Sequence, residues 1–381
     1  MKKLIRTSTV ALSLDYLLKG QLKFLSDFYE VVGVSGQDVH LDNVAKRETV
    51  RTMNLPMQRA ISPMKDLVAL WQLYWLFKKE KPQIVHSITP KAGLLSMIAA
   101  YFAGVPIRMH TFTGLIFPSK TGLMQKVLIE MDKLLCFFAT HIYPEGKGVK
   151  NDLLHYNITT KPLKVLANGN VNGIDTKHFS SIHFSTHDKR SLREQLKIEP
   201  NDFVFIFVGR LVGDKGINEL IDAFKVFSIS SVKLLLVGPY ENDLDPLQVE
   251  TQEEIDQNPN IITVGFQPDV RPYFAISNAL VFPSYREGFP NVVLQAGAMD
   301  LPSIVSNING CNEIITEGEN GLIVPVKDAS ALQEAMKSLI TDQDLYRYLK
   351  SNARANIVAK YEQEVVWQAI LEEYKNAEGH V

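Results

Sequence analysis

Cysteine is almost missing from this chain of 381 residues, in which only Cys136 and Cys311 occur. Two cysteines are too few for a disulfide framework or for a four-ligand zinc site. We therefore expect two buried thiols in a reducing compartment. Hydrophobic residues make up 46% of the chain and charged residues 22%, a balance that excludes a disordered or fibrous protein.

Long apolar runs are missing as well. No uninterrupted apolar run reaches the ~20 residues that a membrane-spanning helix requires. The start of the chain, Met1–Arg6, superficially resembles a secretory signal peptide, but Arg6 and Asp15 interrupt the apolar stretch and no cleavage site of small residues follows. We expect this segment to form a first buried strand and the protein to be cytoplasmic.

Charge is distributed unevenly, although the net charge is only −2. Residues 1–183 contain 23 Lys and Arg against 13 Asp and Glu, whereas residues 184–381 contain 17 against 29. Halves this unequal indicate two domains with different partners. A basic half suits an anionic membrane or a phosphate, and a solvated surface without a partner explains it equally well. Nucleic acid is the weakest choice, because no recognised motif with interleaved aromatic residues is present.

Short apolar runs alternate with helical patterns, as is typical of βαβ units and parallel sheets. The predicted strands are Lys3–Arg6, Tyr29–Val34, Gln83–Ser87, Ile107–Thr111, His141–Tyr143, Lys164–Ala167, Phe203–Val208, Lys233–Val237, Ile261–Val264, Leu280–Pro283 and Ser303–Ser306. The predicted helices are Asp66–Lys79, Lys91–Ala103, Leu123–Phe138, Lys215–Ser228, Ala329–Thr341, Gln343–Val358 and Glu364–Asn376. A polar segment without periodicity, Ser180–Asp188, places a domain boundary at 183/184. The fold class is therefore α/β.

A glycine-containing loop, Gly209–Gly216, follows one of the predicted buried strands. A helix that opens near Gly216 presents unpaired N–H groups and the positive end of its dipole, and both suit a phosphate. Arg210 and Lys215 add two cations there, so the loop fits a diphosphate that gains negative charge as it leaves. A solvated strand–helix turn is the simpler interpretation of the same residues, and the spacing is not that of a Walker loop.

A second loop, Ser284–Gln295, follows the predicted strand Leu280–Pro283. It brings Glu287 to the carboxyl end of that strand, where open α/β sheets bind ligands. Pro290 suits the first position of a helix, because its missing N–H would have no partner there. Glu287 would accept hydrogen bonds from sugar hydroxyls, and Gln295 would reach a ribose. Alternatively, Glu287 only stabilises a helix start through the dipole.

Together the two loops resemble glycosyltransferase family 4, the retaining nucleotide-sugar transferases of the GT-B fold. The motifs of the second half are Gly209-Arg210-Leu211…Lys215-Gly216, Glu287-Gly288-Phe289-Pro290, Gly310-Cys311-Asn312-Glu313 and Gly321-Leu322-Ile323-Val324-Pro325. The first half resembles the bacterial capsular and exopolysaccharide branch through Thr89–Leu94, Ala103–Arg108 and Asn172–Asp175. The resemblance implies two Rossmann-like domains that face a cleft, with residues 1–183 binding the acceptor and residues 184–362 binding the nucleotide sugar.

The resemblance implies catalytic roles for Arg210, Lys215 and Glu287. The two cations would grip the donor diphosphate, and Glu287 would hold the transferred sugar with the neighbouring backbone amides. The expected substrate-binding residues are Gly209, Gly288, Phe289, Pro290, Asn291 and Gln295. The family motif has a second Glu where this chain has Gln295, and an amide offers the ribose one oxygen and no charge.

The first half departs from the family at Thr113-Gly114, where many relatives have a His-Gly pair. We therefore assign no catalytic histidine. His86 and His110 could both lie near the cleft at strand ends, and a structural role is the simpler interpretation of each. The loop Thr7–Ser13 carries small hydroxyl residues where many relatives have glycines.

The implied activity is transfer of a hexose or N-acetylhexosamine from a nucleotide diphosphate sugar, with UDP as the expected nucleotide. The implied acceptor is a saccharide linked to a polyprenyl diphosphate, and the implied role is the synthesis of capsule or lipopolysaccharide. Arg210, Lys215 and the helix end supply positive charge, so neither a metal nor a cofactor is expected. Two alternatives stay open: a nucleotide-sugar epimerase on the same fold, and a non-catalytic subunit that binds nucleotide sugar.

Two Lys-bearing apolar helices, Asp66–Lys79 and Leu123–Phe138, carry Trp71, Trp75 and the pair Phe137-Phe138. Aromatic residues on a basic surface would suit an anionic membrane, whereas packing against the sheet explains them more simply. With the lipid-linked acceptors of the family, we expect a protein on the inner face of the cell membrane.

The end of the chain, residues 363–381, is expected to cross back onto the first domain, as the last segment does in this fold. The helix predicted over Glu364–Asn376 offers Val365, Ile370 and Leu371 for packing there.

Overall fold

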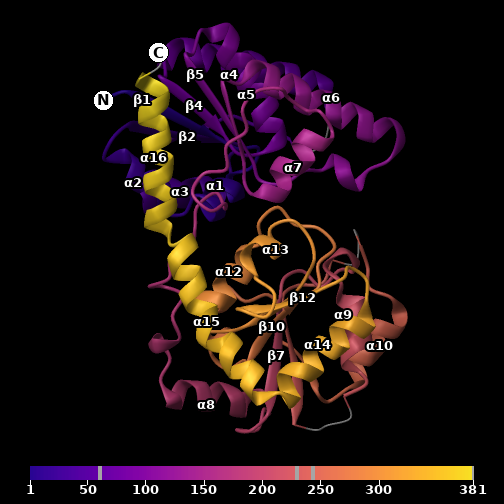
Figure 1. The fold of residues 1–381 in the computed structure, drawn as a ribbon. Helices are drawn as coiled ribbons and strands as arrows, with labels where there is room; N and C mark the ends of the chain where they lie inside the picture. The colour runs from indigo at the N-terminus through magenta and orange to yellow at the C-terminus, as the bar shows by residue number, and fades with distance from the viewer. Residues whose placement is uncertain (59–61, 228–230, 242–244, 380–381) are drawn as a thin grey trace. The chain divides into compact units, whose positions relative to one another are not determined.

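The computed structural model describes residues 1–58, 62–227, 231–241 and 245–379. They form two compact units, which Figure 1 shows with the helices that cover each sheet. Unit 1 combines Met1–Gly173 with Gln363–Val381, and unit 2 is Ile174–Glu362. The change from unit 1 to unit 2 therefore lies at 173/174, and the terminal segment belongs to unit 1.

Unit 1 is built on a parallel sheet with the strand order β3-β2-β1-β4-β5-β6. Its strands are β1 (Lys3–Thr7), β2 (Glu30–Ser35), β3 (Arg51–Asn54), β4 (Ile84–Ser87), β5 (Ile107–Phe112) and β6 (His141–Pro144). Its α-helices are α1 (Ala11–Leu17), α2 (Gln21–Ser26), α3 (Val39–Glu48), α4 (Pro63–Glu80), α5 (Pro90–Ala103), α6 (Gly122–Phe138), α7 (Lys147–His155) and α16 (Gln363–Gly379). The order of the strands reverses between β1 and β4, which is where doubly wound sheets bind ligands.

Unit 2 repeats this topology with the strand order β12-β11-β10-β7-β8-β9. Its strands are β7 (Phe203–Val208), β8 (Val232–Val237), β9 (Ile261–Thr263), β10 (Ala279–Phe282), β11 (Ser303–Ser306) and β12 (Gly321–Val324). Its α-helices are α8 (Thr186–Gln195), α9 (Ile217–Phe224), α10 (Val249–Gln257), α11 (Arg271–Ala275), α12 (Asn291–Ala298), α13 (Cys311–Ile314), α14 (Ala329–Thr341) and α15 (Gln343–Tyr361). The order of the strands here reverses between β7 and β10.

The central strands of unit 2, β7 and β10, are apolar along their whole length because helices cover both faces of the sheet. In β7, the four residues from Val204 to Phe207 are completely buried. The same rule explains why most predicted strands are confirmed to within a residue or two at each end. Two sheets of parallel strands, each covered by helices, confirm the α/β fold class.

Several elements differ from the prediction. The strand predicted over Lys164–Ala167 is wrong: only isolated bridges form near it, at Leu163 and Ala167. The helix predicted over Lys215–Ser228 is α9, which begins at Ile217 after a 3-10 turn over Gly213–Lys215, and Ser228 lies outside the described residues. Strands β3 and β12 were not predicted.

The segment Ser180–Asp188 is more ordered than its lack of periodicity suggested. Helix α8 begins at Thr186, and Ser185 and Asp188 form a capping box in which each side chain accepts from the other's backbone N–H. Because α8 has no fully buried residue, hydrophobic periodicity could not reveal it.

Helix α16 packs against unit 1, alongside α2 (Figure 1). Ile370 and Leu371 are buried there as predicted, but Val365 is exposed and Val366 is buried in its place. Tyr374 fixes the helix by accepting a hydrogen bond from the completely buried Arg6, with 2.5 Å between Nη1 and Oη.

Candidate active site

The two loops predicted to carry the chemistry meet at the point of unit 2 where the order of the strands reverses. Gly209–Gly216 follows β7, and the loop from Pro283 to Pro290 follows β10. Gly216 has a φ of +71°, and a Cβ on it would lie 2.1 Å from the carbonyl oxygen of Pro283. The N–H of Tyr285 also donates to the carbonyl of Asp214 at 2.9 Å. These contacts hold the loops together at the carboxyl edge of the sheet.

Lys215 and Glu287 form an ion pair at this point, Nζ with Oε1. The side chains are only 16% and 17% exposed, so solvent screens the pair less than it would at the surface. The same Oε1 accepts a hydrogen bond from the buried hydroxyl of Ser284 at 2.8 Å, and Nζ lies 5.8 Å from the centre of the Phe282 ring. Two of the three predicted catalytic side chains are therefore in direct contact.

Arg210 has a different partner. Its Nη1 lies 2.5 Å from Oε2 of Glu241, which follows β8, and its side chain is 43% exposed. The backbone beside it is fixed, because the N–H of Leu211 donates to the carbonyl of Pro239 at 2.8 Å. Arg210 and Lys215 thus come from one loop but are bound to carboxylates from two different strand ends.

The backbone between Glu287 and α12 is in close contact with Gly310. Gly310 has a φ of +75°, and a Cβ on it would lie 2.4 Å from the carbonyl oxygen of Gly288. In the part of the chain that the structure describes, no hydrogen bond uses the amide N–H groups of Gly288 and Phe289. Pro290 precedes α12 as its N-cap rather than occupying its first position, which corrects the predicted boundary by one residue.

The remaining predicted binding residues lie along the same edge. Gly209 has a φ of +156°, and its carbonyl oxygen would lie 1.8 Å from a Cβ on Gly238, so both positions need glycine. Asn291 is the first residue of α12, and Gln295 lies one turn further along, partly buried.

Cys311 lies close enough to the Lys215–Glu287 ion pair for both charges to act on its thiol. The residue is completely buried and is not in a disulfide. Burial raises the pKa of its thiol well above the usual value, and the charge of Glu287 adds to this effect. Burial likewise raises the pKa of the Cys136 thiol to about 12. The prediction of two buried thiols is confirmed.

His86 and His110 are both buried in unit 1 and bonded to neighbouring side chains. His86 lies between Tyr374 and Thr111, with its ring nitrogens 2.6 Å and 2.8 Å from their hydroxyl oxygens, and burial with the nearby charge of Arg6 holds its pKa well below the usual value. His110 contacts Ser87 at 2.8 Å and is completely buried, which lowers its pKa to about 3.

Two Asp-x-Asp triplets, a motif that often holds a metal against a diphosphate, occur at 243–245 and 342–344. In the first, Asp243 lies outside the described residues, and Asp245 accepts the N–H of Asp214 at 2.6 Å. In the second, Asp342 caps α15. Among the described residues, no group of three His, Cys, Asp or Glu is placed to hold a metal ion.

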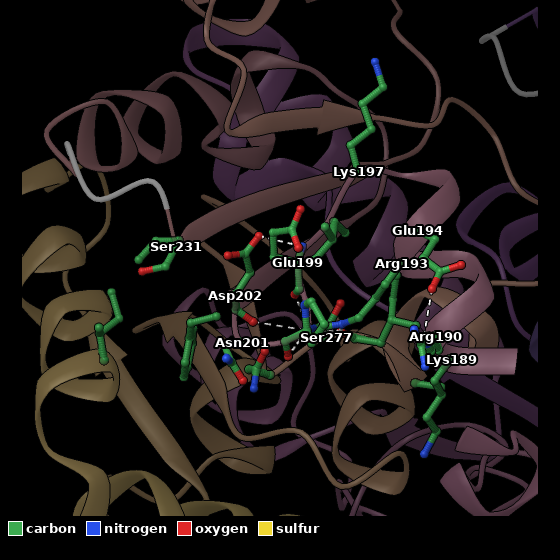
Figure 2. Close-up of a pocket in the computed structure, with 18 of the residues that line it drawn as sticks. Lys189, Arg190, Arg193, Glu194, Lys197, Glu199, Asn201, Asp202, Ser231 and Ser277 are labelled. Atoms are coloured by element: carbon green, nitrogen blue, oxygen red, sulfur yellow. Dashed lines mark hydrogen bonds and ion pairs between the residues drawn. The ribbon is translucent and has the colours of Figure 1, made fainter. Parts of the chain in front are cut away.

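A large cavity of about 1190 Å³ lies at the opposite edge of the same sheet (Figure 2). Asp202, Ser231 and Ser277, which line it, precede β7, β8 and β10. Arg193 spans one wall and donates to the backbone carbonyls of Glu199, Pro200, Asp202 and Ile276. The role of Arg193 is to fix a loop, so this cavity is not a candidate for the catalytic site.

Sequence reasoning missed three contributors to the site: Ser284, Glu241 and Gly310. Ser284 belongs to the loop already singled out, and its hydroxyl orients Glu287. Glu241 follows a predicted strand, so the sequence could have placed it at the same edge of the sheet as the two loops. Gly310 had been noted only as part of a motif, and its close approach to Gly288 appears only in three dimensions.

Comparisons with known proteins identify the family of the chain. Residues 188–356 match the family described as glycosyl transferases group 1, and residues 10–144 match the family described as glycosyl transferase 4-like. The capsular polysaccharide biosynthesis glycosyltransferase CapM of Staphylococcus aureus is 33% identical over 99% of both chains.

Two further similarities extend the comparison. An Escherichia coli enzyme named UDP-Gal:alpha-D-GlcNAc-diphosphoundecaprenol alpha-1,3-galactosyltransferase is 30% identical over 82% of this chain and 80% of its own. Among solved structures, HepE of Anabaena in complex with UDP and glucose has a TM-score of 0.84 at 18% identity, covering 99% of this chain and 100% of its own. Because the identity to HepE is low, this similarity is evidence for the fold alone.

Proposed function

The chain belongs to the group 1 glycosyl transferases of family 4, and from this premise we propose that it transfers a hexose or N-acetylhexosamine from a UDP-sugar to a lipid-linked saccharide with retention of configuration. Unit 2 binds the donor and unit 1 binds the acceptor. As a member of a transferase family with glycosyltransferase relatives, the chain is an enzyme, and we do not retain the epimerase or the non-catalytic alternative.

The contact between Lys215 and Glu287 carries this proposal. A cation suited to a diphosphate and a carboxylate suited to sugar hydroxyls lie side by side, where the order of the strands reverses. Their adjacency suits a nucleotide sugar, in which the diphosphate is bonded directly to the sugar ring. In the resting structure, each group neutralises the charge of the other until the donor enters.

The reaction breaks the bond between the sugar's anomeric carbon and the diphosphate oxygen, and it forms a bond to an acceptor oxygen. The proton of the acceptor hydroxyl passes to the departing phosphate oxygen, so no side-chain base is required. Lys215 and Arg210 stabilise the negative charge that develops on the leaving diphosphate, which is the type of contribution that usually dominates catalysis. Glu287 and the free amides of Gly288 and Phe289 hold the transferred sugar.

Two fixed cations supply the charge that a divalent metal would otherwise provide. We therefore expect transfer without a metal. Full activity in the presence of a chelator supports this expectation, whereas loss of activity that manganese restores contradicts it.

The relatives' names support the choice of donor and acceptor. The E. coli relative is named for a UDP-linked galactose donor and a GlcNAc-diphosphoundecaprenol acceptor. A Campylobacter jejuni relative, 25% identical over 83% of this chain and 82% of its own, is named for an acceptor with the same diphospho-undecaprenol group. The capsular relative suggests a role in surface polysaccharide synthesis.

A transfer assay tests the proposal directly. The purified chain is incubated with UDP-sugars and a short-chain polyprenyl-diphosphate-linked N-acetylglucosamine, and the product is separated and its anomeric configuration is read by NMR. We expect a single α-linked product from a UDP-α-sugar. A β-linked product would refute retention, and the absence of transfer with every donor would refute the choice of acceptor.

We also propose that unit 1 binds the inner face of the cell membrane. In the described residues, no helix is long and apolar enough to cross a bilayer, so binding would occur at the surface. Trp71 and Trp75 of α4 and Phe137 of α6 are 65%, 53% and 69% exposed, which contradicts the interpretation that they pack on the sheet. Phe138 is partly buried against the core, as that interpretation expects. Helices α4, α5 and α6 are neighbours (Figure 1).

Exposed apolar and basic residues share these helices. The exposed apolar residues of α4 and α6 are Met64, Leu67, Val68, Trp71, Trp75, Leu123, Met124, Val127, Leu134 and Phe137. Lys65, Lys78, Lys79 and Lys126 are exposed beside them. Aromatic side chains at the headgroup level and lysines against anionic lipid are the chemistry of an interfacial surface.

Vesicle flotation tests this surface. We expect the chain to float with vesicles that contain anionic phospholipid, and the double variant Trp71→Ser/Trp75→Ser to float several-fold less. Phe266→Ser is the matched control, because Phe266 is 66% exposed but lies in unit 2. Equal flotation of both variants would refute the proposed surface.

A further inference from the structure

A second pocket lies in unit 1, at the point where that sheet also reverses its strand order. Thr9 and Val10 follow β1, Thr89 and Pro90 follow β4, and α6 closes the opposite side. The pocket has a volume of about 280 Å³, enough for part of a sugar residue. Its apolar walls are formed by Val10, Leu94, Ile116, Leu128 and Met131.

The polar groups of this pocket are mostly engaged with one another. The hydroxyl oxygens of Thr9 and Thr89 lie 2.8 Å apart, and the N–H of Ala92 donates to Thr9 at 3.1 Å. The ammonium of Lys91 contacts both carboxylate oxygens of Asp66, at 2.8 Å and 3.0 Å. These residues form a fixed frame around the cavity.

Asp132 and Ser13 are the exceptions. Asp132 lines the pocket from α6 and Ser13 from α1, and neither side chain has a hydrogen bond or ion pair within the described residues. Burial raises the pKa of Asp132 to about 7, so the neutral acid is accessible near neutral pH. The charged or titratable groups nearest to it are Lys91, which is bound to Asp66, and the Cys136 thiol on the same helix.

A neutral carboxylic acid has a hydroxyl that donates and a carbonyl that accepts. An acetamido group presents the complementary pair, a carbonyl and an N–H, together with a methyl group that requires an apolar wall. We propose that this pocket binds the acetamido group of the acceptor sugar, with Asp132 pairing with its amide and Leu94, Leu128 and Met131 enclosing its methyl. This inference rests on the proposed function, because it assigns the acceptor to unit 1.

Other occupants fit the pocket less well. An isoprenoid chain would fill the apolar walls but would leave Asp132 buried without a partner, which is unfavourable. A sugar with only hydroxyl groups would satisfy Asp132 but would place polar groups against the three apolar side chains. An acetamido sugar satisfies both features, so Asp132 is expected to determine specificity between amino and neutral sugars.

Binding of simple glycosides tests the pocket without transfer. We would compare methyl N-acetylglucosaminide with methyl glucoside by saturation-transfer NMR on the full chain. Asp132→Asn retains one donor and one acceptor and should keep the preference for the acetamido sugar. Asp132→Leu removes both and should lose it, while Glu130→Gln, an exposed neighbour on the same helix, serves as the control. An unchanged preference in Asp132→Leu, or no preference in the unaltered chain, overturns the inference.

Transfer kinetics give a second readout. With lipid-diphosphate acceptors that carry N-acetylglucosamine or glucose, we expect Asp132→Leu to reduce the ratio of the two kcat/KM values by about tenfold to hundredfold. The change should appear in the KM for the acceptor, with the KM for the UDP-sugar unchanged. Calorimetric binding of UDP separates the two hypotheses. If Asp132→Leu binds UDP normally and transfers sugar with an unaltered preference, the proposed role of the pocket alone is refuted. If the unaltered chain transfers sugar to no acceptor, the proposed function is refuted.

Discussion

At the scale of single residues, Lys215 should matter most for the rate. Replacing it with Ala removes the cation that we propose stabilises the leaving diphosphate, and it leaves Glu287 with the Ser284 hydroxyl as its remaining partner among the described residues. By analogy with the loss of one oxyanion-hole donor, we expect kcat to fall by about 10²–10³-fold. Steady-state kinetics with a UDP-sugar measure this directly.

Lys225 provides the control for that measurement. It lies just after α9, is exposed and pairs with Asp222, so Lys225→Ala should leave kcat within about twofold, as expected of a surface pair. If both variants lost activity equally, the position of Lys215 in the site would not explain its effect.

Gln295 is a second residue with a testable role. Gln295→Glu restores the charge that the family motif places there, and a charge-assisted hydrogen bond is roughly twice as strong as a neutral one. We expect the KM for the UDP-sugar to fall by about fivefold, equivalent to ~1 kcal/mol, with little change in kcat. A higher KM would show that the ribose does not lie beside this helix turn.

Asp132 also makes a prediction about stability. An Asp whose folded pKa lies near 7 binds more protons when folded than when unfolded between about pH 4 and pH 7, so folding stability falls as the pH rises through this range. Asp132→Asn removes that loss. We expect the variant to match the unaltered chain at pH 4 and to be more stable at pH 8, by on the order of 4 kcal/mol. Denaturant titrations at the two pH values would detect this, and an equal difference at both would contradict the raised pKa.

At the scale of elements, a buried polar contact of Tyr374 is one of several that hold helix α16 in unit 1. Tyr374 bonds to both Arg6 and His86, and two further nitrogens of the Arg6 guanidinium have no partner among the described residues. Tyr374→Phe leaves a buried cation with even fewer hydrogen bonds. We expect a loss of about 1–3 kcal/mol in the free energy of unfolding, measured by chemical denaturation, against no loss for Tyr348→Phe, whose ring is 55% exposed.

The sequence was informative about elements wherever burial was complete. Strand β7 was predicted to the residue because six apolar residues in succession suit a strand covered on both faces. Strand β3 was missed because it is an edge strand with two exposed residues out of four, and α8 because it has no apolar stripe. Propensity alone identifies neither type of element.

The site loops were predictable for a related reason: each is a local motif at the end of a buried strand. The partners within the site were not, because Glu287 contacts Lys215 across 72 positions and Glu241 contacts Arg210 across 31. The exposed Trp71 and Trp75 show the same limit, since an apolar helix face has the same sequence pattern whether it packs on a sheet or against lipid.

At the scale of the whole molecule, the charge asymmetry follows the division into units. Unit 1 contains 23 Lys and Arg against 16 Asp and Glu, and unit 2 contains 17 against 26. An anionic bilayer would therefore attract unit 1 and repel unit 2, which suits the lipid-linked acceptor that we propose for unit 1.

This orientation makes binding sensitive to salt and to the position of a charge. Each Lys near an anionic surface contributes about 1 kcal/mol, an attraction that falls off within a Debye length of ~8 Å at physiological salt. We expect flotation with anionic vesicles to decrease steeply as salt rises, and Lys126→Glu on α6 to weaken it by more than tenfold. Lys337→Glu on α14 of unit 2 carries the same charge change at an exposed position and should have little effect. If the two reversals weakened flotation equally, net charge rather than the α4–α6 surface would control membrane binding.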